Sequence, residues 1–84
     1  MMNIIHKFEV SQWAVWELPV TALFLSMQVQ RGVPVAWFLY DTEHPKVGMP
    51  VIVIGTGHEI ADVPGCYIGT YQDGGFVGHV FLDK

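Results

Sequence analysis

The sequence has almost nothing with which to cross-link itself. Cys66 is the single cysteine among 84 residues, so neither an intrachain disulfide nor a CxxC metal site can form. A chain of this kind suits a reducing compartment, because disulfides are typical of oxidising ones. We therefore expect a cytoplasmic protein.

Charge is also scarce, and positive charge is the scarcer kind. Only 14% of residues are charged, with 4 basic and 8 acidic side chains and a formal net charge of -4. Affinity for a phosphate backbone comes from clustered lysine and arginine, which this chain lacks. The composition predicts no direct contact with nucleic acid, whereas an acidic surface is compatible with docking on a basic patch of another protein.

Long apolar runs are missing too, although 51% of the residues are hydrophobic. Nothing approaches the roughly 18 apolar residues of a membrane span, and the opening MMNIIHKFEV does not resemble a secretory leader. We expect a soluble protein without a membrane partner. We expect the 84 residues to form one domain, 1–84, whose small core favours help from a homo-oligomer such as a dimer.

β-Branched and aromatic residues are abundant, and glycine and proline interrupt them at short intervals. That pattern is typical of short strands joined by turns. It predicts a mainly β fold, a small antiparallel sandwich or partly open barrel of six to seven strands with at most a short helical turn. The expected strands cover residues 3–10, 13–18, 22–30, 33–41, 50–55, 66–72 and 76–82.

The segment ALFLSMQVQRGVPVAWFLYD reads as a β-hairpin that turns at Arg31 and Gly32. Glycine readily adopts the positive φ that a tight hairpin needs. Apolar residues at 23, 25, 27 and 29 alternate with the residues between them, which predicts one apolar face. A helix over residues 18–30 is the competing interpretation, and the β-branched residues and the polar positions fit it less well.

The polar stretch from Asp41 to Pro50, DTEHPKVGMP, contains two prolines and a glycine and is predicted to be a loop. Any helical turn is expected between Glu59 and Pro64.

The tetrapeptide GTGH, Gly55 to His58, has the composition of either a ligand loop or a turn. A phosphate loop requires GxxxxGK followed by Ser or Thr, and a dinucleotide fingerprint requires a third glycine where Ile60 stands. Both motifs are absent, so a tight turn or bulge is favoured over a ligand loop.

Catalytic and metal-binding patterns are equally weak. HEIAD begins like the zinc motif HExxH but ends in Asp62, and the four histidines are isolated. Cys66 and the few hydroxyl side chains stand in no recognised nucleophile motif, and the carboxylates are scattered. The sequence predicts no cofactor, no metal and no enzymatic activity.

Aromatic residues are the remaining candidates for function. Neighbours such as Trp37 and Phe38 point to opposite faces of a strand, so both faces of the hairpin carry apolar bulk. A second sheet or a subunit interface would cover the second face, and aromatic rings opposite the GTGH segment could also stack a base.

Several motifs together resemble a family of small proteins encoded by bacteriophages and prophages. They are IHKFEV, LPVTALFLSMQVQRGVPVAWFLYD, IVIGTGHEI and YIGTYQDGGFVGHVF, and they extend from Ile5 to Phe81. The resemblance implies a short, acidic accessory protein of the kind that includes inhibitors of bacterial defence, such as anti-CRISPR proteins. It carries over no functional residue.

Two functional hypotheses follow. In the first, a non-enzymatic protein inhibits a host protein, such as a CRISPR-type defence complex, by steric occlusion through acidic and aromatic surface residues. In the second, a homo-oligomer binds or sequesters a nucleotide signal. The residues proposed to bind a partner or ligand are Trp13, Trp16, Trp37, Glu43, Thr56, Gly57, His58 and Glu59.

Overall fold

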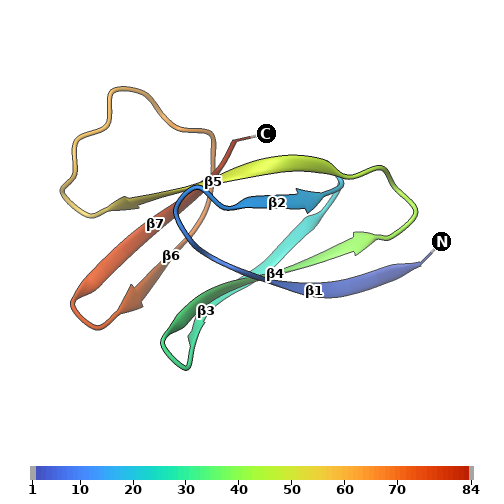
Figure 1. The fold of residues 1–84 in the computed structure, drawn as a ribbon, viewed down its shortest axis with the longest axis horizontal. Helices are drawn as coiled ribbons and strands as arrows, with labels where there is room; N and C mark the ends of the chain where they lie inside the picture. Colours follow the sequence, from blue (N-terminus) through green and yellow to red (C-terminus); the bar gives the residue numbers. More distant parts are fainter. Residues whose placement is uncertain (1, 84) are drawn as a thin grey trace.

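A computed structural model, which describes residues 2–83, contains seven β-strands and, among these residues, no helix (Figure 1). All pairings are antiparallel. The predicted β fold is therefore confirmed, and each expected strand is present. The strands are β1 (Asn3–Glu9), β2 (Val15–Leu18), β3 (Leu23–Gln30), β4 (Val33–Asp41), β5 (Val47–Gly55), β6 (Cys66–Asp73) and β7 (Phe76–Leu82).

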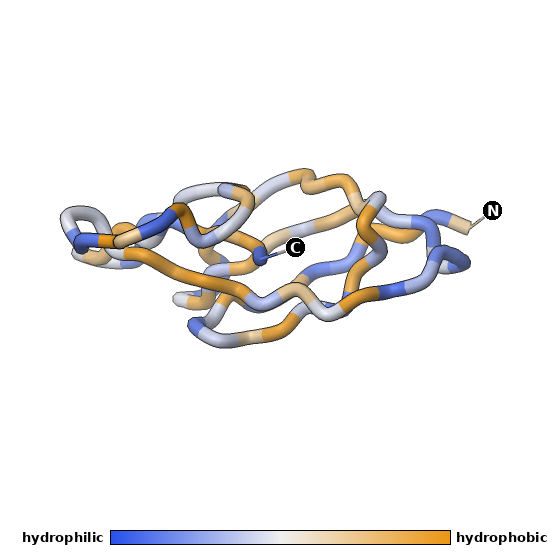
Figure 2. The backbone as a smooth tube through the Cα atoms, turned by 90° about the horizontal axis from the view of Figure 1, so that it is seen from above, coloured by the Kyte–Doolittle hydropathy of each residue, from blue (hydrophilic) through white to orange (hydrophobic). Residues whose placement is uncertain are grey.

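The strands form two sheets, one of three strands in the order β1-β4-β3 and one of four in the order β2-β5-β7-β6. The chain measures 42 × 31 × 16 Å along its principal axes, so it is flat, as the edge-on view in Figure 2 shows. Its thickness fits two sheets packed face to face about 10 Å apart. Hydrophobic segments occur in both layers.

The core lies between the sheets and is built by alternation along the strands. Trp16 and Leu18 of β2 point inward, whereas Val15 and Glu17 are exposed. Phe38 of β4 makes edge-to-face ring contacts with Trp16 and with Phe24, at centroid distances of 5.7 and 5.5 Å. Such pairs add about 0.5–1.5 kcal/mol each beyond the area they bury. This aromatic cluster joins the two sheets, because Trp16 belongs to one and Phe38 to the other.

The hairpin between β3 and β4 forms as predicted. Gln30 pairs with Val33, and the two residues between them, Arg31 and Gly32, have φ values of 51° and 78°. Positive φ at both central positions is the type I′ turn, whose twist matches that of the flanking strands.

The predicted alternation of β3 is interrupted by a β-bulge between Phe24 and Ser26. The expectation that residues 23, 25, 27 and 29 share one apolar face is therefore wrong. The extra residue at Leu25 shifts the register, because two residues oppose one on the partner strand. Phe24 and Met27 pack against the core, whereas Leu23 and Leu25 face solvent.

The predicted loop over residues 41–50 is too long by five residues, because β4 ends at Asp41 and β5 begins at Val47. Pairing with β2 extends β5, with Val47 opposite Leu18 and Pro50 opposite Val15. Pro50 is tolerated because its missing N–H falls where β7 has ended; its carbonyl accepts from Asp83 N at 3.0 Å. The short helical turn that the sequence allowed between Glu59 and Pro64 does not form: the segment from 58 to 65 is irregular.

The edge of β5 beyond β2 is closed by a side chain. The Gln12 amide donates to Val53 O at 3.1 Å and accepts from Val53 N at 2.8 Å. The side chain therefore replaces a backbone partner at this edge, which protects it from pairing with another chain. Among the described residues, no helix is long and apolar enough to cross a membrane.

Candidate functional site

The GTGH tetrapeptide is a tight turn at the end of β5. His58 N donates to Gly55 O at 3.2 Å, and Gly57 has a φ of 88°, which glycine accepts without strain. The turn favoured by the sequence is present.

This turn sends Thr56 and His58 to opposite faces of the four-stranded sheet. A Cβ at Gly55, which would point inward, would lie 3.0 Å from the His58 ring and 3.2 Å from Phe76. His58 therefore packs on the inner side, beside Phe76. Thr56 is outward, because its hydroxyl contacts His79, which alternates with the buried Val80 along β7.

On the outer face, Thr56 belongs to a hydrogen-bonded chain of four side chains, which we call the His79 network: Thr56, His79, Thr70 and Tyr67. The Thr56 hydroxyl lies 2.6 Å from His79 Nε2, and the Thr70 hydroxyl lies 2.9 Å from His79 Nδ1. Tyr67 OH lies 2.6 Å from the Thr70 hydroxyl. Strand order creates this arrangement, since β5 and β6 flank β7 and pair Ile54 and Thr70 with His79.

A proton count shows what the His79 network offers a ligand. With a neutral imidazole, three hydroxyls and one ring N–H supply four protons for three contacts. One donor is left over. It lies on Thr56 when Nε2 carries the ring proton, and on Tyr67 or Thr70 when Nδ1 carries it. The network can therefore present a donor at one end and an acceptor at the other.

The surroundings of the network are aromatic and apolar. The rings of Tyr67 and Phe81 meet edge to face, with centroids 5.5 Å apart. On the inner side of the same sheet, Tyr71 covers Gly78, where an added Cβ would lie 2.6 Å from the ring. Burial, followed by the nearby Asp73 carboxylate, raises the pKa of Tyr71, so Tyr71 stays protonated near neutral pH.

The outer face of the three-stranded sheet is different in kind. Leu39 of β4 lies between Ile5 of β1 and Leu23 of β3, and Trp37 follows on the same face. Ile5 is 64% exposed and Leu23 57%, while Trp37 and Leu39 are half-buried. We call these residues, with Leu25, the outer apolar face.

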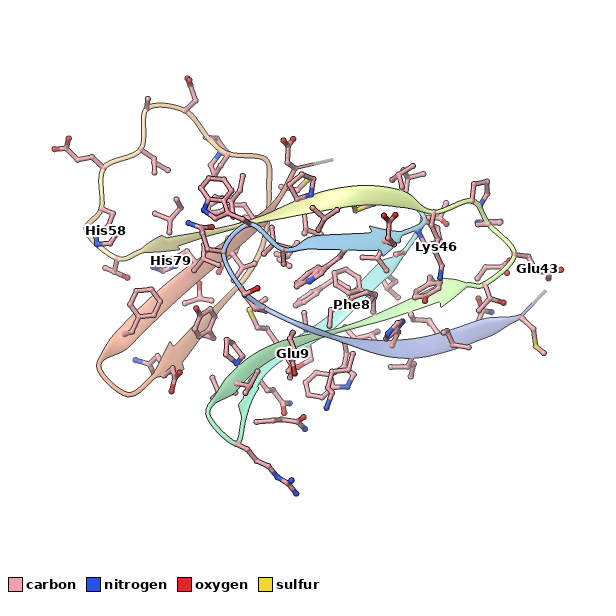
Figure 3. The ribbon with its side chains drawn as sticks, in the orientation of Figure 1. Phe8, Glu9, Glu43, Lys46, His58 and His79 are labelled. Atoms are coloured by element: carbon pink, nitrogen blue, oxygen red, sulfur yellow. The ribbon has the colours of Figure 1, made fainter. Side chains whose placement is uncertain are left out.

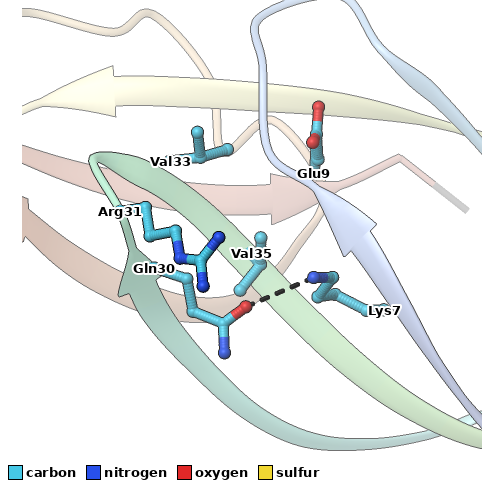
Figure 4. Close-up of a pocket in the computed structure, with 6 residues that line it drawn as sticks. All are labelled: Lys7, Glu9, Gln30, Arg31, Val33 and Val35. Atoms are coloured by element: carbon cyan, nitrogen blue, oxygen red, sulfur yellow. Dashed lines mark hydrogen bonds between the residues drawn. The ribbon is translucent and has the colours of Figure 1, made fainter.

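Towards the hairpin, this sheet becomes polar and is hollowed (Figure 4). Val33 and Val35 contribute apolar surface to an open hollow of about 600 Å³, around which lie Lys7, Glu9, Gln30 and Arg31. Lys7 Nζ donates to Gln30 Oε1 at 3.3 Å. The hollow therefore combines an apolar surface with two cationic side chains and one carboxylate.

The residues proposed from the sequence do not form one site. Trp16 is only 4% exposed, and its Nε1 donates to Glu9 O at 3.1 Å, so its proposed role in binding is wrong: it points inward from β2. Trp13 is 75% exposed and adopts a positive φ of 69° beside β5, while Trp37 lies on the other sheet. Glu43 lies between β4 and β5, far from His58, as Figure 3 shows. Glu59 is exposed beside the GTGH turn, next to Gly57 and His58.

Sequence reasoning missed three members of the His79 network: Tyr67, Thr70 and His79. The available signal was the repeated IGT, at 54–56 and 68–70. Its two threonines lie on either side of His79, one at each ring nitrogen. Within residues 2–83, no group of three His, Cys, Asp or Glu side chains could hold a metal ion.

Comparison with known proteins gives a family but no function. No curated protein and no solved structure matches the sequence. A family model described as a domain of unknown function, DUF7352, matches residues 1–84. The chain therefore belongs to the DUF7352 family.

Proposed function

We propose that this chain acts without catalysis, by binding another protein through its outer apolar face and blocking that protein's surface. The observation that carries the proposal is the row of Ile5, Leu39 and Leu23 across three strands, on a face that no other element of the described chain covers. Burying such side chains yields about 1.5–3 kcal/mol each. A contiguous apolar patch on a small protein typically marks an interaction site.

Trp37 strengthens the proposal. Its half-buried ring lies on this face, and within residues 2–83 its indole N–H has no hydrogen-bond partner, whereas that of Trp16 is satisfied in the core. A tryptophan that offers both apolar area and an unused donor is a typical anchor of a protein interface.

The proposed partner is a host protein, and the setting is inhibition of a bacterial defence complex of the CRISPR type. The motif resemblance to phage-encoded accessory proteins supports this setting. The net charge of -4 supports a target with a basic surface that otherwise holds nucleic acid. The mechanism is steric occlusion, which requires no reaction.

The proposal is tested by quantitative affinity capture from bacterial lysate with three baits. Leu23→Glu places a charge on the outer apolar face, whereas Val63→Glu places the same charge on an apolar residue that is also exposed, in the loop before β6. We expect the wild type and Val63→Glu to retain one protein that Leu23→Glu loses at least tenfold. Equal retention by both variants, with both folded by circular dichroism, contradicts the proposal.

A second candidate function rests on the His79 network. We propose that it binds a small polar molecule such as a nucleotide signal, with a ligand hydroxyl meeting the unused donor and a base stacking on Tyr67. Thermal shift and NMR titration against a cyclic-nucleotide panel test this. Thr70→Val should abolish binding, and His58→Ala, on the other face of the sheet, should not. Loss through His58→Ala alone would contradict this site.

A further inference from the structure

The edge of β1 presents unpaired backbone groups in a defined row. Val10 N donates to Pro34 O at 2.8 Å, and Thr42 N donates to Met2 O at 2.8 Å. In an antiparallel ladder the residues that bond to the partner alternate. The even-numbered residues of β1 therefore bond to β4, and Asn3, Ile5, Lys7 and Glu9 direct their N–H and C=O groups away from the sheet.

Part of this row is already used and part is free. The Glu9 carbonyl accepts from Trp16 Nε1, which ends the row. In the described chain, no hydrogen bond reaches the outward backbone groups of Asn3, Ile5 and Lys7. Figure 1 shows β1 at the margin of the molecule, with no strand beyond it.

The other long edges are protected by the fold itself. The Gln12 amide closes the edge of β5. The edge strands β3 and β6 lie against each other where Met27 contacts Gly69, and each carries a bulge that disrupts regular pairing. A regular free edge therefore remains at β1. Lys7 is the one charged residue among Asn3, Ile5 and Lys7, so little charge opposes pairing of this edge with another strand.

We propose that β1 pairs with β1 of a second copy of this chain, antiparallel, about a two-fold axis at Ile5. This register places Ile5 opposite Ile5 and Asn3 opposite Lys7. Every outward N–H of the three residues then meets an outward C=O of the other copy. The free row is centred on Ile5, so it is complementary to itself, which is the requirement of a two-fold interface.

Side-chain chemistry favours a copy as the occupant. The two Lys7 side chains lie four residues apart along the paired strands, roughly 14 Å, which is beyond the Debye length of about 8 Å at physiological salt. Pairing also covers Ile4 and Ile5, which are exposed on opposite faces of β1. It joins two outer apolar faces into one six-stranded surface, so the dimer enlarges the surface proposed to bind a partner.

The test uses the fact that the odd-numbered residues of β1 direct their backbone groups away from β4. Proline at position 5 removes an N–H that β4 does not use, so Ile5→Pro should keep the fold and weaken the dimer at least tenfold in sedimentation velocity across a concentration series. Ile5→Lys is the second variant, which keeps the backbone and adds charge at the axis. A wild type that is monomeric at all concentrations overturns the proposal, and so does a dimer unchanged by Ile5→Lys.

Cross-linking tests the register. In a Cys66→Ser background, Ile5→Cys places two thiols at the axis, within the Cα separation that a disulfide tolerates. We expect an intermolecular disulfide under mild oxidation, at a rate far above that of Val63→Cys in the same background. Equal rates overturn the register.

Lysate capture with Asn3→Pro separates this proposal from the proposed function, because Asn3 is not part of the outer apolar face and its N–H is directed to the second copy, so the substitution weakens the dimer without altering the binding face. A monomeric variant that still retains the host protein leaves the proposed function intact. A dimeric wild type that retains no host protein leaves the dimer intact.

Discussion

The outer faces of the two sheets differ in how their outward side chains are paired or covered. On the four-stranded sheet, outward side chains satisfy one another through the His79 network and the Tyr67–Phe81 ring pair. On the three-stranded sheet, Ile5, Leu39 and Leu23 stand in a row with nothing over them. Polar side chains of the first surface are paired with one another, whereas the second surface gains by being covered.

This difference between the two faces follows from the small size of the core. Trp16, Phe38 and their neighbours fill the space between the sheets, and several apolar residues that lie outside this core, among them Ile5, Leu23 and Leu25, are exposed on the three-stranded sheet's outer side. Exposed apolar side chains occur on both sheets, but the four-stranded sheet also carries the His79 network, whereas the residues of the outer apolar face make no side-chain hydrogen bond in the described chain. We interpret this asymmetry as a division between a self-sufficient face and a binding face.

The largest effect on stability should come from truncating an inward residue of β4, in comparison with its outward neighbour. Phe38→Ala removes a ring that contacts Phe8, Trp16 and Phe24, and we expect it to cost about 3–5 kcal/mol of unfolding free energy. Trp37→Ala, on the opposite face of β4, should cost less than half as much. Urea denaturation of both variants measures this. Equal losses would mean that Trp37 belongs to the core.

The next effect concerns the inner side of the four-stranded sheet. A Cβ at Gly78 would lie 2.6 Å from the Tyr71 ring, so Gly78→Ala forces the ring to move. We expect a loss of about 1–3 kcal/mol, as for overpacked cores. Gly75→Ala is the matched control, because an added Cβ there meets nothing within 4 Å. A thermal melt that ranks the control as the less stable variant would contradict this packing.

A smaller effect is expected within the His79 network. Thr70→Val removes the hydroxyl between His79 and Tyr67 while preserving shape, and should cost about 0.5–1.5 kcal/mol, the net value of a typical hydrogen bond. Imidazole ¹⁵N chemical shifts of His79 should change at the same time. Unchanged shifts would show that the contact does not persist in solution.

The smallest effect is a pH dependence at Tyr71. Because burial raises the folded-state pKa of this phenol above its unfolded value, folding favours the protonated form. The resulting stability is fully present below pH about 10 and is lost as pH rises through the folded pKa. Tyr71→Phe should therefore reduce the loss of stability on the alkaline side, which denaturation at pH 9 and above measures. Identical alkaline profiles would argue against a shifted Tyr71.

Local sequence was sufficient for much of the fold. β-branched residues marked the strands, and Arg31-Gly32 marked the type I′ hairpin, because such turns depend on the residues within them. The bulge at Leu25 and the extension of β5 through Pro50 could not be predicted this way. Both depend on what the partner strand offers, which is a property of the assembled sheet.

The candidate sites were less predictable than the strands. Thr56 was found through its glycine-rich neighbours, but His79 gains its role because β5 and β6 lie on either side of β7. Trp16 and Trp37 are the same residue type, yet Trp16 lies in the core and Trp37 faces outward. Alternation along each strand determines which face a side chain occupies. Strand order and parity are therefore the information that the sequence pattern left out.

Site-specific photocross-linking tests the central claim most directly. A benzophenone side chain at position 23 lies on the outer apolar face, and one at position 72 lies on the outward side of the four-stranded sheet. In bacterial lysate we predict a cross-linked host protein from position 23 and none from position 72. A host protein captured from position 72 and not from position 23 would contradict the assignment of the binding face.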